Sequence, residues 1–129
     1  MAYTAPTDDI IVQEGTFAYS FKCSGTIYPG QAVYPVATME VKAVSANYEP
    51  GCIGVAAYKK TDDGYIGVYG PGNIVRVIVS GTAVAVSDRL LPVNEGKWKE
   101  GTGAHSSGCQ AIALETQATD NGTCRVLLI

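Results

Sequence analysis

The residues of this chain that have the right chemistry for catalysis are few. His105 is the only histidine, and Ser106 and Ser107 follow it in a glycine-rich stretch. A histidine that acts as a general base must be held by an orienting partner, and a hydrolase serine stands in a Gly-x-Ser-x-Gly turn. The sequence around His105 provides neither feature. We therefore interpret His105 as a solvated loop residue and predict that the protein is not an enzyme.

Two pairs of adjacent carboxylates, Asp8-Asp9 and Asp62-Asp63, are the other candidates for acid–base or metal chemistry. Acid–base catalysis requires one carboxyl group of a pair to be desolvated, and calcium requires several spaced oxygen ligands. The second pair belongs to an Asp-Asp-Gly turn, and the first precedes any strand pattern. The glycine-rich stretches do not connect a strand to a helix, as a phosphate-binding loop would. The sequence thus predicts no catalytic residue, no metal site and no cofactor.

The four cysteines are Cys23, Cys52, Cys109 and Cys124. They are widely scattered and form no Cys-x-x-Cys pair, so a zinc site is not expected. The N-terminal residues lack the basic and apolar segments of a secretory signal. We expect folding in a reducing cytosol, with buried thiols that act as small apolar groups.

Composition limits the possible partners. The net charge is −3 and no basic patch is visible, so nucleic acid is not an expected partner. No apolar run is long enough to cross a membrane. Only 16% of residues are charged, and tyrosines outnumber phenylalanines by 8 to 2. Both features are typical of a surface covered by a partner, and both also fit a small β-domain with a Ser- and Thr-rich surface.

Two stretches of the chain repeat two others. Gln31-Ala-Val-Tyr-Pro-Val36 aligns with Asp88-Arg-Leu-Leu-Pro-Val93, and Gly51-Cys-Ile-Gly-Val-Ala56 aligns with Gly108-Cys-Gln-Ala-Ile-Ala113. The offset is 57 residues both for the prolines (92 − 35) and for the cysteines (109 − 52). Two matches at one offset predict two copies of one β-unit.

Most of the chain has the alternating or β-branched pattern of short strands separated by turns. The strands are expected at 17–21, 31–36, 40–44, 52–58, 65–69, 74–79, 82–86, 90–93, 97–98, 109–116 and 123–129. No long helical stripe is present. We predict an all-β fold, a compact barrel or sandwich with an internal duplicated β-unit, in which 17–129 form a single domain. Residues 1–16 show no pairing pattern and are expected to form an extended N-terminal arm.

Several short motifs resemble a known family. In order they are Gly-Gln-Ala-Val-Tyr-Pro-Val, Gly-Cys-Ile-Gly-Val-Ala-Ala, Ile-Gly-Val-Tyr-Gly-Pro-Gly, Val-Ser-Asp-Arg-Leu, Ala-Ile-Ala-Leu-Glu and Cys-Arg-Val-Leu-Leu-Ile. Over residues 12–129 the chain is similar to the small β-rich decoration, or cement, proteins of tailed-phage capsids.

The resemblance implies a structural virion protein without catalysis. It implies a homotrimer on the outer face of an icosahedral capsid, assembled in the host cytoplasm, with the major capsid protein as partner. The N-terminal arm is then expected to contact the capsid or a neighbouring subunit. The contact residues expected in this arm are Tyr3, Pro6, Asp8, Asp9, Ile11 and Gln13.

A carbohydrate- or ligand-binding β-module on a virion or cell surface is the alternative interpretation. Such a module requires a concave site with an aromatic side chain beside fixed polar groups. Trp98, close in sequence to Lys97 and Glu95, is the candidate for this site.

Overall fold

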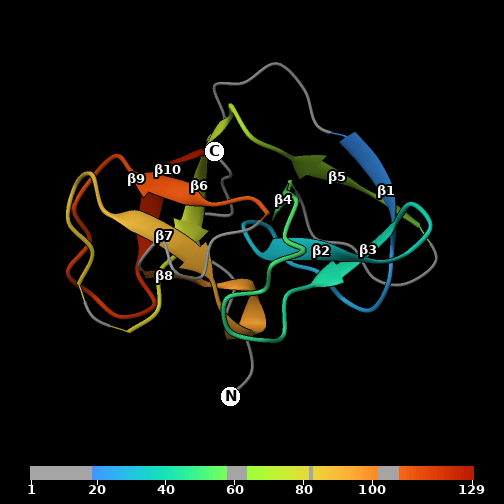
Figure 1. The fold of residues 1–129 in the computed structure, drawn as a ribbon, viewed down its shortest axis with the longest axis horizontal. Helices are drawn as coiled ribbons and strands as arrows, with labels where there is room; N and C mark the ends of the chain where they lie inside the picture. The colour runs from blue at the N-terminus through green and yellow to red at the C-terminus, as the bar shows by residue number, and fades with distance from the viewer. Residues whose placement is uncertain (1–18, 58–63, 82, 102–107) are drawn as a thin grey trace.

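The computed structural model describes residues 19–57, 64–81, 83–101 and 108–129. They form ten short strands and one 3-10 turn, arranged as two neighbouring β-lobes (Figure 1). The elements are β1 (Tyr19–Cys23), β2 (Ala32–Ala37), β3 (Glu40–Ala43), β4 (Gly54–Ala56), β5 (Tyr65–Tyr69), β6 (Ile74–Ile78), β7 (Arg89–Pro92), η1 (Asn94–Gly96), β8 (Trp98–Glu100), β9 (Ala111–Ala113) and β10 (Thr123–Leu128). The all-β prediction is confirmed.

The first five strands form a closed barrel in the order β1-β3-β2-β4-β5. Every pair of neighbours is antiparallel except β1 and β3, which run parallel and close the barrel at Cys23 and Val41. Closure matters because it leaves no edge between the first and the last strand of the sheet. We call this unit the first barrel.

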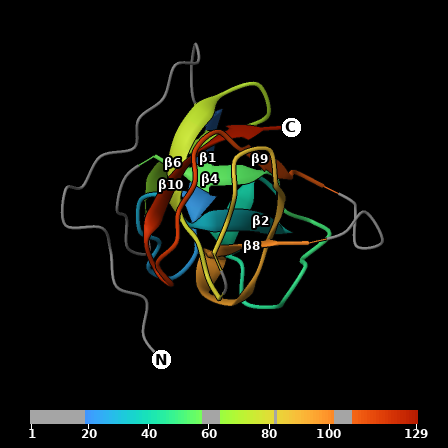
Figure 2. The ribbon, with the colours of Figure 1, turned by 90° about the vertical axis from the view of Figure 1, so that its left-hand side faces the viewer.

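The last five strands repeat the arrangement in the order β6-β10-β9-β7-β8. A parallel bridge between Val79 and Trp98 joins the two ends of this sheet, in the same way that Cys23 and Val41 are joined in the first barrel. We call this unit the second barrel. It lies to the left in Figure 1 and faces the viewer in Figure 2.

The two units correspond residue by residue. Pro35 pairs with Val41 across β2 and β3, and Pro92 pairs with Trp98 across β7 and β8. The pairing of β2 with β4 recurs between β7 and β9 with the same offset of 57, since Ala32↔Val55 corresponds to Arg89↔Ile112. The duplicated β-unit predicted from the sequence is therefore present, down to the strand register.

The barrel interiors correspond as well. Among the described residues, seven buried apolar side chains form the core of the first barrel: Cys23, Ile27, Val33, Val41, Ala56, Ile66 and Val68. The matching positions of the second barrel are also buried: Val79, Val84, Leu90, Trp98, Ala113, Cys124 and Val126. The second set belongs to a larger cluster that also includes Ala32, Val44, Cys52 and Val55 of the first barrel. The two barrels thus share one apolar core at their junction.

The prediction of a strand at 82–86 is wrong. Residues 82–86 alternate in sequence, but among the described residues 83–86 the only strand pairing is an isolated bridge between Val84 and Gln117. The backbone turns instead, because the Asp88 carboxylate accepts a hydrogen bond from the Ala85 N–H (2.9 Å). Aspartate stabilises such turns with its own side chain. The strands predicted at 52–58 and 109–116 are shorter than expected, at Gly54–Ala56 and Ala111–Ala113.

Candidate functional site

Most of the residues singled out in the sequence lie outside the described part of the chain. This holds for the predicted contact residues Tyr3, Pro6, Asp8, Asp9, Ile11 and Gln13, and for the predicted arm as a whole. It also holds for Asp62, Asp63, His105, Ser106 and Ser107. Within the described residues, no three His, Cys, Asp or Glu side chains gather as metal ligands, and no helix could cross a bilayer.

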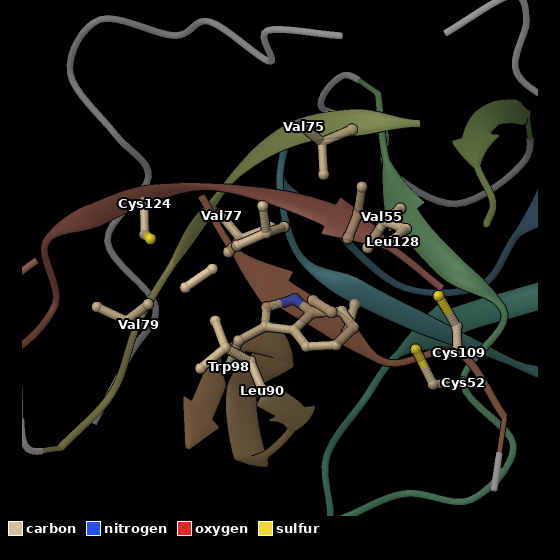
Figure 3. Packing of buried hydrophobic residues seen from close by; sticks show 14 of the residues in the cluster. Cys52, Val55, Val75, Val77, Val79, Leu90, Trp98, Cys109, Cys124 and Leu128 are labelled. Carbon is tan, nitrogen blue, oxygen red and sulfur yellow. The ribbon is translucent and has the colours of Figure 1, made fainter. Parts of the chain in front are cut away.

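Trp98 is not available to a carbohydrate. Its side chain is 0% exposed and fills the interior of the second barrel, next to Leu90 in the cluster of Figure 3. The sequence-based expectation for Trp98 is therefore wrong. The cause is alternation along β8, which turns Trp98 inward while Lys99 on the same strand faces solvent.

The polar groups beside Trp98 form a hollow at one end of the second barrel. It has a volume of about 220 Å³ and is lined by Asn47, Tyr48, Ser80, Val93, Asn94, Glu95, Lys97 and Lys99. The Lys97 ammonium lies 3.2 Å from the Glu95 carboxylate and donates a hydrogen bond to Asn121 Oδ1 at 2.8 Å. This buried lysine is thus already compensated by its neighbours, and the hollow presents Lys99 as its other cationic group.

The cysteines at repeated positions meet at the junction of the two barrels. Their sulfur atoms lie side by side in Figure 3, and the Cys109 N–H donates to the Cys52 carbonyl at 2.7 Å. Two effects raise the pKa of Cys52 well above its ordinary value of 9.0. The larger is the hydrogen bond between the two thiols, and the second is burial, which disfavours the charged thiolate. Burial also raises the pKa of Cys124. All four cysteines are buried and none forms a disulfide, in agreement with the buried free thiols predicted from the sequence.

Gly108 allows this close approach. Its backbone has φ +73, and a Cβ there would lie 2.3 Å from the Pro50 carbonyl oxygen and 2.7 Å from that of Cys52. Only glycine fits such a position without strain. The repeat-equivalent Gly51 has ordinary contacts, the nearest being Glu49 Oε2 at 3.7 Å, so the two aligned glycines have different roles.

The junction also covers one end of the second barrel. We call this end the closed mouth; it is formed by Val75, Val77 and Leu128. Val55, on the outer wall of the first barrel, lies beside Val75 and Leu128 in Figure 3, and all belong to one buried cluster. Buried apolar contacts of this kind are the main source of stability at such a junction.

The corresponding end of the first barrel is a groove of about 290 Å³. We call it the open mouth; it is lined by Tyr19, Phe21, Ile53, Val68, Gly70 and Pro71. The strand registers match Tyr19 to Val75, Phe21 to Val77 and Gly70 to Leu128. Tyr19 is 57% exposed, whereas Val75 is 0% exposed. The groove has almost no polar lining, which is typical of a protein-binding surface.

The sequence left open whether the tyrosines fill the core or lie on the surface, and the structure contains both kinds. Tyr34 and Tyr69 pack against the shared core, whereas Tyr19 and Tyr65 are largely exposed on the first barrel. Sequence reasoning did not find the open mouth. The signal was present in the repeat, because the first copy carries Tyr and Phe where the second copy carries two valines.

These features define a class: a tandem of two small β-barrels with a shared core and an exposed apolar groove. No family model and no curated protein matches the chain. Among solved structures, the chain is similar to the head fiber gp8.5 N base of bacteriophage phi29, with a TM-score of 0.63. The likeness covers 93% of this chain and 95% of that one at 13% sequence identity, so it concerns the fold.

Proposed function

We propose that this protein is a non-enzymatic structural component of a tailed-phage virion. In this proposal it binds the major capsid protein on the outer surface of an icosahedral capsid and stabilises the shell. It does so as a homotrimer, with residues 1–16 contributing to attachment. The proposal includes the cement-type role expected from the sequence.

The observation that carries the proposal is the fold likeness to a phage head-fiber base over nearly the full length of both chains. Fold alone does not determine function, so the inference from this neighbour is an analogy. The sequence motifs support the same proposal independently, since they resemble those of the decoration proteins of phage capsids.

The surface of the described residues supports a binding role. The apolar open mouth and the exposed side chains of Met39 and Tyr65 all lie on the first barrel. Exposed apolar surface that is concentrated on one barrel is typical of a site that binds another protein. The predicted arm adds backbone donors and acceptors that can pair with a sheet edge on the shell or on another subunit.

The test uses capsids of the cognate phage and the full-length protein. We expect the protein to cosediment with capsids that lack it and to raise the temperature at which they release their DNA. Deletion of residues 2–12 should leave the circular dichroism spectrum unchanged and weaken retention on capsids under heat or chelator stress. His105→Ala, outside the arm, is the control and should bind like the parent.

Failure of the full-length protein to bind any capsid preparation would refute the capsid-binding role. If the truncated protein binds and stabilises capsids as well as the full chain, the arm has no part in attachment and the barrels alone carry the function.

A further inference from the structure

Cys52 and Cys109 meet at the junction although the repeat assigns them to different barrels. The Cys109 N–H donates to the Cys52 carbonyl at 2.7 Å, so the two backbones are in direct contact. In sheets, residues linked by backbone hydrogen bonds have Cα atoms about 5.5 Å apart. Disulfides join Cα atoms that are about 4.4–6.8 Å apart, so a backbone contact of this kind is compatible with a disulfide.

The side chains of the pair are oriented toward each other as well. Figure 3 shows the two sulfur atoms facing one another, and the thiols share a hydrogen bond. Gly108 lets the two segments come this close, because a Cβ there would lie 2.7 Å from the Cys52 carbonyl oxygen. Since the backbones are already adjacent, rotation of the two side chains is the main movement that an S–S bond requires.

We propose that Cys52 and Cys109 are a site of oxidative cross-linking, in which a disulfide joins the two barrels after the particle leaves the reducing cytosol. The oxidant is a small peroxide such as hydrogen peroxide. The thiolate of one cysteine attacks a peroxide oxygen, the O–O bond breaks, and a sulfenic acid and one water are formed. The second thiol attacks the sulfenic sulfur, the S–S bond forms, the S–O bond breaks, and a second water leaves. Two thiols thus lose two electrons and two protons, and one peroxide is reduced to two waters.

The cross-link would fix the junction covalently. It closes a loop over residues 53–108, which contain the strands from β4 to β8. A disulfide stabilises mainly by restricting the unfolded chain, and the effect grows with the length of the loop. Burial and the raised pKa of Cys52 keep its thiol protonated, so the pair should react slowly and stay reduced during assembly. The timing of the reaction rests on the proposed function, whereas the cross-link itself does not.

Oxidation of the purified full-length protein tests the cross-link. The fully reduced protein is incubated with hydrogen peroxide at about pH 8.5, where more thiolate is present. The remaining thiols are alkylated in denaturant, and intact mass and peptide mapping identify the products. We expect the parent to lose two hydrogen atoms, to take up two labels instead of four, and to yield a peptide pair linked through Cys52 and Cys109.

Two alanine variants are the matched comparison. Cys52→Ala removes one partner and should give no cross-link, while Cys124→Ala, which alters a buried cysteine of the same cluster, should cross-link like the parent. Circular dichroism verifies that both variants fold. The oxidised parent should melt at least about 5 °C above the reduced parent, and dithiothreitol should reverse this shift. Peroxide should not raise the melting temperature of Cys52→Ala.

Several outcomes would overturn the inference. A link between any other pair of cysteines, four labels on the parent after prolonged oxidation, or sulfinic acid at Cys52 or Cys109 without a link would each refute the site. A lower melting temperature of the linked protein would refute its stabilising role.

The timing is tested on particles of the cognate phage. We expect two labels on the protein from released particles and four on the protein from particles alkylated inside the host before lysis. Four labels in both samples would refute cross-linking in the virion and leave the proposed function intact. Absence of the protein from every particle preparation would refute the proposed function, while the cross-link in the purified protein would stand.

Discussion

Replacing Trp98 separates the two contributions of this side chain to stability. The indole is 0% exposed, and among the described residues no acceptor lies within hydrogen-bond distance of its Nε1–H. Burying a donor without a partner costs about 1–3 kcal/mol, whereas burying the ring itself is strongly favourable. The two terms have opposite signs, so a substitution that removes only the N–H differs from one that removes the ring.

Trp98→Phe keeps an aromatic ring in the barrel and removes the unsatisfied donor. The lost apolar area corresponds to one or two methylene equivalents, or about 1–2 kcal/mol. The relief of the buried N–H offsets this, and we expect the free energy of unfolding to stay within about 1 kcal/mol of the parent. Trp98→Ala leaves a cavity at the barrel centre and should cost about 3–5 kcal/mol.

Urea unfolding followed by far-UV circular dichroism measures both variants, since Trp98 is the only tryptophan and its fluorescence is lost on substitution. Parent fluorescence provides a second check, because a buried indole should be protected from acrylamide quenching. If Trp98→Phe destabilises the protein as much as Trp98→Ala, the N–H is satisfied in solution and the reasoning is wrong. A small effect of Trp98→Ala would show that the indole does not fill the barrel.

Two further predictions concern the barrel junction. Gly108→Ala should lower the free energy of unfolding by about 2 kcal/mol or more, since φ +73 and a 2.3 Å approach to the Pro50 oxygen strain any side chain; Gly51→Ala, the matched control, should change it by less than about 1 kcal/mol, and equal effects would contradict the role of Gly108. Because the pKa of Cys52 is raised in the folded state, its contribution to stability is full below pH 9.0 and is lost as the pH rises above that value. The urea midpoint of the parent should therefore fall more steeply above pH 9.0 than that of Cys52→Ala, and parallel pH profiles would show that the thiol pKa is not raised.

The fold was predictable because many of the repeated residues have strong backbone preferences. Pro35 and Pro92 occupy one register position of two equivalent hairpins, and the aligned Cys52 and Cys109 meet at the junction. β-Branched runs such as Ile74–Ile78 were assigned correctly because their pattern matches a half-buried strand. The segment 82–86 was misassigned because the Asp88 side chain stabilises a turn that alternation does not reveal.

The candidate site was less predictable than the fold. Trp98 looked like a ligand platform because Lys97 and Glu95 are close in sequence, yet β8 directs its side chain into the core. The exposure of Tyr19 depends on how one barrel is covered by the other, and sequence periodicity gives only the face of a strand and not its tertiary partner. Only the strand register identified Val75 as the equivalent of Tyr19 and so made their exposures comparable.

The two copies diverge most where the repeat would otherwise produce identical surfaces. Inside the barrels, apolar residues stand opposite apolar residues of different size: Val41 corresponds to Trp98 and Ile66 to Cys124. Cores tolerate hydrophobic exchanges that keep the apolar pattern, so these differences change the packing and keep the fold. At the ends of the barrels the two copies differ in whether a side chain is present. Gly70 of the first barrel has no side chain at the position that Leu128 fills in the second barrel, and the first barrel has an apolar groove of about 290 Å³ there. An unfilled apolar groove forfeits packing contacts. Among the described residues, the barrel end that lacks the Leu128 side chain is therefore less well packed than the end that has it.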